Sequence, residues 1–376
     1  MAETTLQAGD WAPHFHATTN TSHHFSFGSL GGRYVILSFL GTLTNKASAA
    51  AYAHMVAKQP WLQGGRMGAY IAVLYDPADM RTLATAPPIP GIRAVFDSEL
   101  AIGRLYGRVT EQDGVRRYSA ITYVLDPMLR VLAALPIDDA GKHDAMLDKV
   151  LATLPPPEAH AGAPLAAPVL VLPRVFEPEF CRRLIELYES HGGVPSGFMR
   201  EVGGMTTVQQ DQNLKRRSDH VIADEALQGE IRWRIERRLV PGVRAAFDFT
   251  ATRLERHLVA CYDSKNGGFF KAHRDNTTKG TAHRRFAVTI NLNAEDYEGG
   301  DLNFPEFGAK TYRAPTGGAV VFGCALLHEA LPVTRGRRYA FLPFLFDEAG
   351  ETLRLENLKF VAQDETVTNP SPEVNN

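Results

Sequence analysis

A stretch rich in proline and alanine, LPPPEAHAGAPLAAP at residues 154–168, limits the fold more than any other part of the sequence. This composition favours a semi-extended linker over a packed helix or strand. A chain of 376 residues also exceeds the usual size of a single hydrophobic core. We therefore predict a first domain at 1–153, a second domain at 169–350 and a polar C-terminal tail at 351–376.

Before the linker, short apolar runs alternate with stretches that favour helix. Three runs predict buried strands: YVILSFL at 34–40, YIAVLY at 70–75 and ITYVL at 121–125. Two stretches predict helices, the alanine-rich residues 47–57 and residues 144–154. Continuous apolar strands that alternate with helices are typical of a sheet covered on both faces. The first domain is therefore predicted to be α/β.

After the linker, two amphipathic helices are predicted at 177–191 and 224–239. From His257 onward, runs typical of strands dominate, and glycine-rich turns separate them. These runs are HLVACY, FAVTINLN, GGDLNF, GAVVFGC and YAFLPFLF. Several short strands that follow leading helices indicate a double-sheet barrel or jelly roll with helical support.

The bulk composition indicates a globular protein of the cytoplasm. Hydrophobic residues make up 44% of the chain, charged residues 22%, and the formal net charge is −2. This balance disfavours a nucleic-acid or membrane-surface binder. Residues 1–11 lack the pattern of a signal peptide, and the apolar stretch 161–173 is too short to span a bilayer. Three widely spaced cysteines, at 181, 261 and 324, are typical of reduced thiols in the cytoplasm.

The second domain contains a candidate metal site around the segment His273-Arg274-Asp275. In a strand, side chains at i and i+2 face the same way, so His273 and Asp275 can enter one cavity. A third ligand is needed, and His328 is the candidate at the end of a later strand. Two histidines and one carboxylate leave three positions open on an octahedral metal, which suits a non-haem Fe(II) oxygenase.

An arginine follows the candidate metal site at a spacing that would allow it to enter the same cavity. Arg338 lies ten residues after His328, across turn residues that predict a hairpin. Such a hairpin would place the guanidinium deeper in the barrel, where it could pair with a carboxylate through two hydrogen bonds. Arg335 and Arg337 are rivals for this role, but strand alternation directs Arg337 to the opposite face from Arg338.

The second half of the chain resembles the prolyl-4-hydroxylase-like branch of the Fe(II)/2-oxoglutarate dioxygenases. The resemblance covers roughly 169–348 and is densest over 261–346. Its motifs follow in the family's order: YDSKNGGFFKAHRDN, FAVTINLN, YEGGDLNFP and APTGGAVVFGCALLHEALPVTRGRRYAF. The resemblance implies a double-stranded β-helix, or jelly roll, as the fold of the second domain.

The resemblance also implies a set of functional residues. The iron ligands would be His273, Asp275 and His328, and Arg338 would bind a carboxylate of 2-oxoglutarate. The remaining matches are Tyr262, which corresponds to a tyrosine that often contacts 2-oxoglutarate, and Asn291, which stands where relatives frequently have another tyrosine. The implied cofactors are Fe(II), 2-oxoglutarate and O2, with ascorbate as a supporting reductant.

The first domain resembles a peroxiredoxin of the thioredoxin fold over residues 5–153. The segments that carry this resemblance are GDWAPHF at 9–15, GRYVILSF at 32–39 and YVLDP at 123–127. That family has its peroxidatic cysteine a few residues after the second segment. Here the chain reads GTLTNKASAAAY, and no cysteine precedes Cys181. Because the thiolate nucleophile is missing, we expect a non-catalytic domain that shapes the oxygenase pocket, recruits a partner or substrate, or forms a homodimer.

The histidines of the first domain offer one further candidate. They lie near the chain start, at positions 14, 16, 23 and 24. Histidines near a terminus are more often solvated than bound to metal, so we expect no metal site there.

The leading hypothesis is a hydroxylase that acts on a C–H bond of an amino acid, a peptidyl proline or another small molecule. A non-catalytic scaffold, desaturation and cyclisation stay open, whereas Asp275 disfavours halogenation because it fills the halide position. Loops that contact the substrate are expected at 193–217 and 276–284. Within the first, the basic segment 215–218 could meet an anion, but a solvated basic turn is favoured.

Overall fold

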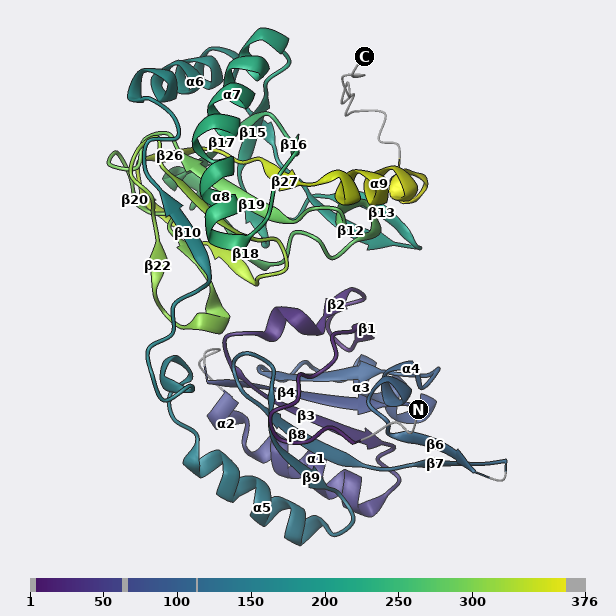
Figure 1. Cartoon of the computed structure of the whole chain (residues 1–376). Helices are drawn as coiled ribbons and strands as arrows, with labels where there is room; N and C mark the ends of the chain where they lie inside the picture. Colours follow the sequence, from purple (N-terminus) through teal and green to yellow (C-terminus); the bar gives the residue numbers. More distant parts are fainter. Residues whose placement is uncertain (1–4, 63–66, 113, 363–376) are drawn as a thin grey trace. The chain divides into compact units, whose positions relative to one another are not determined.

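The computed structural model describes residues 5–62, 67–112 and 114–362 of the chain (Figure 1). The chain forms two compact units, and the main boundary between them lies between Ala166 and Ala167. This boundary falls within the proline- and alanine-rich segment. A short stretch from the second half, Phe304–Lys310, is grouped with the first unit.

The first unit contains a seven-stranded sheet in the order β2-β1-β5-β4-β3-β8-β9. Strands β3, β4 and β5 are parallel, and β8 and β9 continue the sheet in antiparallel pairing. The strands of the unit are β1 (His16–Thr19), β2 (Phe25–Ser26), β3 (Tyr34–Gly41), β4 (Gly68–Leu74), β5 (Ile92–Phe96), β6 (Val109–Gln112), β7 (Val115–Tyr118), β8 (Ile121–Leu125) and β9 (Val131–Pro136). Its helices are α1 (Lys46–Ala57), α2 (Gln59–Leu62), α3 (Pro77–Thr85), α4 (Ala101–Leu105) and α5 (Ala140–Thr153), with 3-10 turns at Phe27–Leu30 and Pro157–Ala159.

Apolar side chains cover both faces of this sheet, as the continuous apolar strands predict. On one face, Met55 of α1 and Leu147 of α5 pack against β3 and β4. On the other face, Phe15 and Phe27 of the leading segment pack with Tyr106. A βαβ core followed by an antiparallel pair and a closing helix is the thioredoxin-like arrangement. The predicted α/β, thioredoxin-like class of the first domain is therefore confirmed.

Polar groups occupy the region where a peroxiredoxin would have its cysteine. The Asn45 side chain caps α1 by accepting from the backbone amides of Ala47 and Ser48. The Thr42 hydroxyl donates to Asp79 Oδ2 at 3.0 Å, and that oxygen also accepts from Leu43 N at 2.7 Å. In this chain, hydrogen bonds of these polar side chains order the loop after β3 and the start of α1, and no thiol is present there.

The second unit has a double-sheet core with helices on one side. Its major sheet runs β10-β23-β19-β26-β17-β15-β11, and β16 and β27 extend it; the minor sheet runs β14-β18-β24-β21-β22. The strands are β10 (Val169–Leu172), β11 (Val194–Pro195), β12 (Phe198–Val202), β13 (Met205–Gln209), β14 (Lys215–Arg216), β15 (Ser218–Val221), β16 (Arg253–Glu255), β17 (Leu258–Asp263), β18 (Phe269–His273), β19 (Phe286–Asn291), β20 (Glu298–Gly299), β21 (Leu302–Asn303), β22 (Thr311–Tyr312), β23 (Ala319–Gly323), β24 (His328–Ala330), β25 (Val333–Arg335), β26 (Arg337–Phe341) and β27 (Phe344–Phe346). The helices are α6 (Pro178–His191), α7 (Glu225–Arg238), α8 (Val240–Phe247) and α9 (Glu348–Asn357). Two antiparallel sheets with supporting helices confirm the predicted jelly roll.

The two faces of the major sheet have different partners. Cys261 and Phe341 point to the helical side and belong to the core that includes residues of α6, α7 and α8. Ala260 and Tyr262 alternate with them and point to the interior side, where they cluster with Ala330 of the minor sheet. The interior between the sheets therefore receives side chains from both, and it contains the candidate site.

The end of the second unit differs from the expected tail at 351–376. Helix α9 extends to Asn357, and a 3-10 turn follows at Leu358–Phe360. The Asp347 side chain caps α9 by accepting from Gly350 N at 2.8 Å. Residues 363–376, which include most of the polar end, lie outside the described residues. Across the described ranges, no helix has the length and apolarity needed to cross a bilayer.

The buried side chain of Phe341 provides a test of the second unit's core. Phe341 has no exposed surface, so Phe341→Ala should lower the free energy of unfolding by about 3–5 kcal/mol through lost burial and a new cavity. Hydrogen-exchange mass spectrometry would report this loss in β17 and β26 separately from the first unit. The matched control is Val171→Ala, because Val171 is 45% exposed and its change should stay within about 0.5 kcal/mol. Equal protection in the two variants would contradict the packing described.

Candidate metal centre

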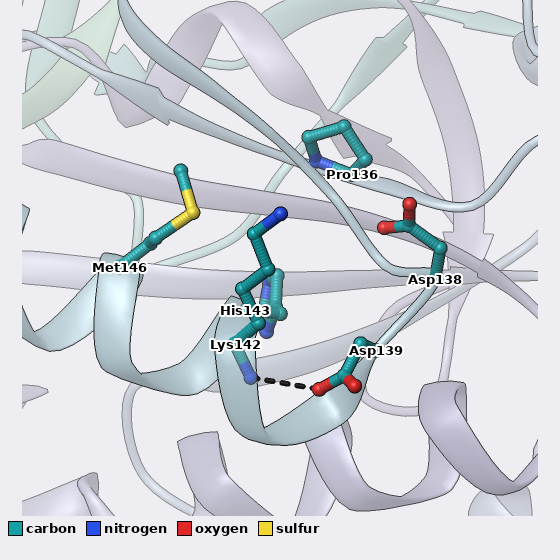
Figure 2. Close-up of a pocket in the computed structure, with 6 residues that line it drawn as sticks. All are labelled: Pro136, Asp138, Asp139, Lys142, His143 and Met146. Carbon is teal, nitrogen blue, oxygen red and sulfur yellow. Dashed lines mark hydrogen bonds between the residues drawn. The ribbon is translucent and has the colours of Figure 1, made fainter.

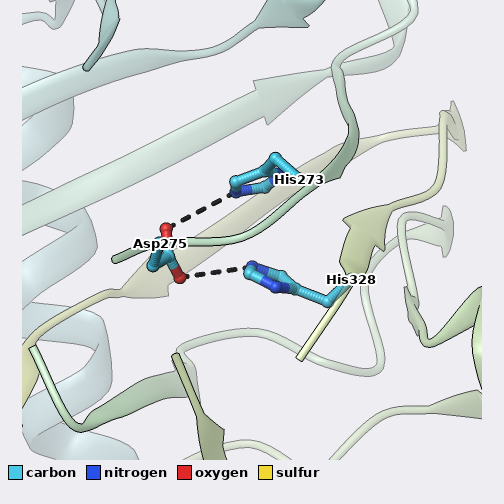
Figure 3. A group of neighbouring side chains, drawn as sticks. All are labelled: His273, Asp275 and His328. Atoms are coloured by element: carbon cyan, nitrogen blue, oxygen red, sulfur yellow. Dashed lines mark ion pairs between the residues drawn. The ribbon is translucent and has the colours of Figure 1, made fainter. Parts of the chain in front are cut away.

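Two neighbouring strands of the minor sheet bring the candidate ligands together. Strands β18 and β24 are antiparallel, and their register pairs His273 with His328. Asp275 follows β18 by two residues, and its backbone N–H donates to Cys324 O at 2.9 Å. One ligand atom from each of His273, Asp275 and His328 lies within 4.8 Å of the others (Figure 3). Among the described residues, no other such group of histidine, cysteine or acidic side chains is found, and none forms at the N-terminal histidines.

The orientation of each imidazole is fixed by a backbone carbonyl. His273 Nδ1 donates to Lys271 O at 2.7 Å, and His328 Nδ1 donates to Leu326 O at 3.0 Å. Both Nε2 atoms therefore face Asp275, at 3.6 Å from His273 to Oδ1 and at 3.3 Å from His328 to Oδ2. A histidine that donates through one nitrogen to a fixed carbonyl can offer the other to a metal. The donor set of two Nε2 atoms and one carboxylate fits Fe(II).

The protonation of this group also suits metal binding. Burial and, to a smaller extent, the neighbouring His273 lower the pKa of His328 to about 4, so the His328 imidazole is neutral at pH 7. Burial alone would raise the pKa of Asp275, but His328 and His273 outweigh it and hold that pKa well below its ordinary value. A neutral imidazole and an ionised carboxylate are the forms that bind a metal.

A buried ion-pair network near Asp275 influences the charge of its carboxylate. Glu255 Oε1 accepts from Arg284 Nη2 at 2.5 Å, and Glu255 Oε2 pairs with His283 Nε2 at 2.7 Å. The Arg284 charge also lowers the pKa of Asp275. Because His283 and Arg284 are buried, the end of the predicted substrate loop 276–284 is part of the support of the metal site and does not face solvent.

Arg338 is buried in the interior between the two sheets, and no carboxylate among the described residues pairs with it. It is paired in register with Tyr262, and its Cζ lies 4.9 Å from the centre of the Tyr262 ring. Arg338 is 2% exposed, and in the described part of the chain neither Nε nor Nη1 has a hydrogen-bond partner. A buried guanidinium in this state is costly unless an anion satisfies it. The rivals are already paired at the surface, Arg337 with Glu189 and Arg335 with Glu298.

Tyr262 and Asn291 face the same interior as Arg338. The Tyr262 side chain is buried, and its hydroxyl accepts from Arg217 Nη1 at 3.4 Å. Asn291 pairs in register with Ala340, two residues from Arg338, so the two side chains share a face. Its Nδ2 donates to Ala314 O at 2.6 Å, while Oδ1 has no partner within the described residues. The structure thus brings the predicted cosubstrate residues together, and their roles stay predictions.

Sequence reasoning missed Tyr297 as a member of this interior. Tyr297 is 3% exposed and belongs to the cluster with Tyr262 and Ala330. No partner for its hydroxyl is found in the described residues, and burial raises the pKa of Tyr297 while the charge of Arg338 partly opposes this shift. The only signal in the sequence was its place directly before Glu298 and Gly299, where we expected a structural turn.

The segment 215–218, predicted as a solvated basic turn, is buried at alternate positions. Lys215 is 3% exposed and Arg217 is 9% exposed, whereas Arg216 lies on the other side. The cause is the pairing of β14 with β18, in which Lys215 stands opposite Phe270. Strand alternation over 215, 217 and 219 could have indicated this burial, but the pairing partner could not be read locally.

A cavity in the first unit offers no comparable chemistry (Figure 2). It has a volume of about 120 Å³ and is lined by Pro136, Asp138, Asp139, Lys142, His143 and Met146. Both ring nitrogens of His143 are already engaged, with Thr122 Oγ1 at 2.9 Å and Asp144 Oδ1 at 2.9 Å. This histidine holds the sheet to α5 and has no free ligand atom.

The jelly roll and the candidate metal triad are the features expected of an Fe(II)/2-oxoglutarate oxygenase. The sequence profile of the 2OG-Fe(II) oxygenase superfamily matches residues 257–346. A PKHD-type hydroxylase of Cupriavidus metallidurans is 30% identical over 182 residues, which cover 46% of this chain and 75% of that protein. The chain belongs to the PKHD-type hydroxylases of this superfamily.

Other relatives are matched over a shorter part of their length. A PKHD-type hydroxylase of Pseudomonas fluorescens is 40% identical over 91 residues, and this chain spans only 39% of it.

Among solved structures, the viral collagen prolyl hydroxylase of Paramecium Bursaria Chlorella virus-1 is similar over 47% of this chain and 94% of its own, with 15% identity and a TM-score of 0.36. Peroxidoxin BcpB of Mycobacterium tuberculosis is similar over 39% and 96%, with 18% identity and a TM-score of 0.34.

Removal of a predicted ligand should abolish tight binding of the metal. His273→Ala and His328→Ala should each weaken Fe(II) binding by more than the roughly 10–100-fold that loss of an outer-shell partner costs. Anaerobic titration calorimetry with Fe(II) would measure the change. His220→Ala is the control, because His220 pairs with His191 and lies outside the triad. The assignment would be wrong if all three variants bound Fe(II) like the unmodified chain.

Proposed function

We propose that the chain is an Fe(II)- and 2-oxoglutarate-dependent dioxygenase that hydroxylates a C–H bond of an amino acid, a peptidyl proline or another small molecule. In the balanced reaction, substrate, 2-oxoglutarate and O2 give hydroxylated substrate, succinate and CO2. The observation that supports this most strongly is the joint presence of the His273, Asp275 and His328 cluster and a buried guanidinium, Arg338, that has no anionic partner among the described residues.

Different residues of the interior would bind the metal and the 2-oxoglutarate. When bound, the iron supplies the redox chemistry that couples decarboxylation of 2-oxoglutarate to oxygen transfer. The two Nε2 atoms and the Asp275 carboxylate would hold the metal on one side and leave its other positions open. Arg338 would bind the distal carboxylate of 2-oxoglutarate, with the hydroxyls of Tyr262 and Tyr297 as neighbouring donors. Ascorbate would support turnover by keeping the iron reduced.

The same site argues against a non-catalytic scaffold. A buried cation without an anion destabilises the fold, so Arg338 would be an unexplained cost in a protein that binds no 2-oxoglutarate. Asp275 occupies the ligand position that a halogenase would leave for halide. We therefore favour hydroxylation, and desaturation or cyclisation of the same substrate would depend on how its C–H bonds face the metal.

For the first unit we propose a non-catalytic role in recruiting the substrate or in self-association. Its sequence has no cysteine, and hydrogen bonds of Thr42 and Asp79 close the loop after β3. The three cysteines of the chain are buried and unpaired. Reduced thiols fit the cytoplasm, which we propose as its location.

Succinate formation tests the proposed activity. The full chain with Fe(II), 2-oxoglutarate and ascorbate should release succinate, even without added substrate, at a rate well above that of His273→Ala. The physical reason is that the variant lacks one of three metal ligands. Chromatographic measurement of succinate would compare them. The proposed function would fail if both proteins gave the same background rate.

The role of Arg338 is tested by the dependence on 2-oxoglutarate concentration. Arg338→Gln should raise the KM for 2-oxoglutarate at least about 30-fold, since loss of one partner of a buried charge pair costs about 2 kcal/mol or more. Arg337→Gln provides the matched control, because its side chain pairs with Glu189 at the surface. An equal KM in the two variants would exclude Arg338 as the anchor.

A further inference from the structure

Three alternate residues of one extended segment face the interior beside the metal centre. They are Lys215, Arg217 and Asp219, and each is less than one-tenth exposed. The segment passes from β14, which pairs with β18 of the minor sheet, to β15, which pairs with β17 of the major sheet. Its inward face therefore lies against the two strands that provide His273 and Tyr262.

The Phe270 ring contacts both Lys215 and His273, a candidate metal ligand. Its Nζ is 4.8 Å from the centre of the Phe270 ring, and the Phe270 ring stacks on that of His273 at 3.5 Å. The Nζ donates to Ser196 Oγ at 2.7 Å and to Gly197 O at 2.5 Å. Both acceptors are neutral, so within the described residues no carboxylate neutralises this ammonium directly.

Arg217 approaches the cosubstrate region from the same side. Its Nη2 donates to Asp219 Oδ2 at 2.6 Å, and its Cζ lies 5.8 Å from the centre of the Tyr262 ring that Arg338 also contacts. Two hydrogen-bonding positions are left over in the described part of the chain, Arg217 Nε and Asp219 Oδ1. This group is thus incompletely satisfied although it is buried.

The charges of this group do not balance. Two cations, Lys215 and Arg217, face a single carboxylate, Asp219, which is bound to Arg217. Burial and the nearby charges of Arg217 and Arg256 lower the pKa of Lys215, and Asp219 and Asp275 only partly oppose them. These influences favour the neutral amine of Lys215. A carboxylate that entered beside it would favour the ammonium form and could accept from Arg217 Nε, which has no partner within the described residues.

We propose that the substrate of the oxygenase carries a carboxylate, which binds between Lys215 and Arg217 beside Phe270. This inference rests on the proposed function and narrows it. The substrate class becomes a free amino acid or another small organic acid, or a peptide with an acidic side chain, and a neutral peptidyl proline is disfavoured. Arg338 stays available for 2-oxoglutarate, and the Phe270 ring offers an apolar contact for the carbon chain near the metal.

Matched acids and amides test the proposal on the full chain with Fe(II), 2-oxoglutarate and ascorbate. The probes are the free L-amino acids, small straight-chain carboxylic acids, the amides of both sets, and capped dipeptides that contain either aspartate or asparagine. The measurement is 2-oxoglutarate consumption above the rate without substrate. At least one carboxylate should stimulate it at least about 10-fold more than its amide, in line with the loss of a hydrogen bond to a charged group. Stimulation by a free acid or by an aspartyl peptide would identify the source of the carboxylate.

The acid-to-amide ratio of each variant separates recognition from folding, because both substrates are measured on the same protein. Lys215→Gln and Arg217→Gln should reduce this ratio at least about 10-fold, whereas Lys215→Arg keeps the charge and should retain most of it. Arg216→Gln is the matched control, since Arg216 donates to Gln212 O and Asn266 O instead of facing the interior. Its ratio should equal that of the unmodified chain.

The outcomes distinguish this inference from the proposed function. Equal stimulation by acids and amides, no stimulation by any carboxylate, or a ratio in Lys215→Gln that equals that of Arg216→Gln would overturn the substrate assignment. In each of these cases, 2-oxoglutarate consumption above the His273→Ala background would leave the oxygenase itself intact. A rate equal to that background would instead refute the proposed function.

Discussion

The antiparallel pairing of β18 with β24 is the interaction on which the candidate site depends. It places His273 opposite His328, and the following Asp275 is held by its backbone bond to Cys324 O. The same strand β18 pairs on its other edge with β14 and so brings Lys215 against Phe270. One strand thus determines the positions of the candidate metal ligands and of the buried basic side chains next to them.

Buried charged side chains in the interior of the second unit differ in how completely they are paired. Near the candidate metal ligands, Glu255 and Arg284 form an ion pair that is neutral as a unit. Arg338, by contrast, has no carboxylate partner among the described residues, and the group around Lys215 contains one carboxylate, Asp219, which is bound to Arg217. If 2-oxoglutarate and a substrate carboxylate bind as proposed, they would supply negative charge to the interior. Their binding would therefore also stabilise the folded second unit.

The sequence was sufficient for the fold class of both units and for the three metal-ligand candidates, because those depend on local alternation and on ordered motifs. It was insufficient where a long-range partner decides burial. Lys215 and Arg217 read locally as a solvated turn, and only the pairing with β18 buries them. The burial of Tyr297 could not be predicted for the same reason, because the residue stands directly before a glycine turn. Helix α9 could have been found, since Asp347 before Glu348 and Glu351 is a typical helix start.

The register irregularity between Phe270 and His273 has a consequence for how this family can vary in length. Side chains in a strand alternate, so a single inserted or deleted residue within 270–275 would turn the aromatic ring, the histidine or the aspartate out of the interior. The exposed turn of Gly203 and Gly204 between β12 and β13 has no such constraint. Natural length variation should therefore accumulate in hairpins of this kind, while the spacing from Phe270 to Asp275 stays constant wherever the iron chemistry is kept.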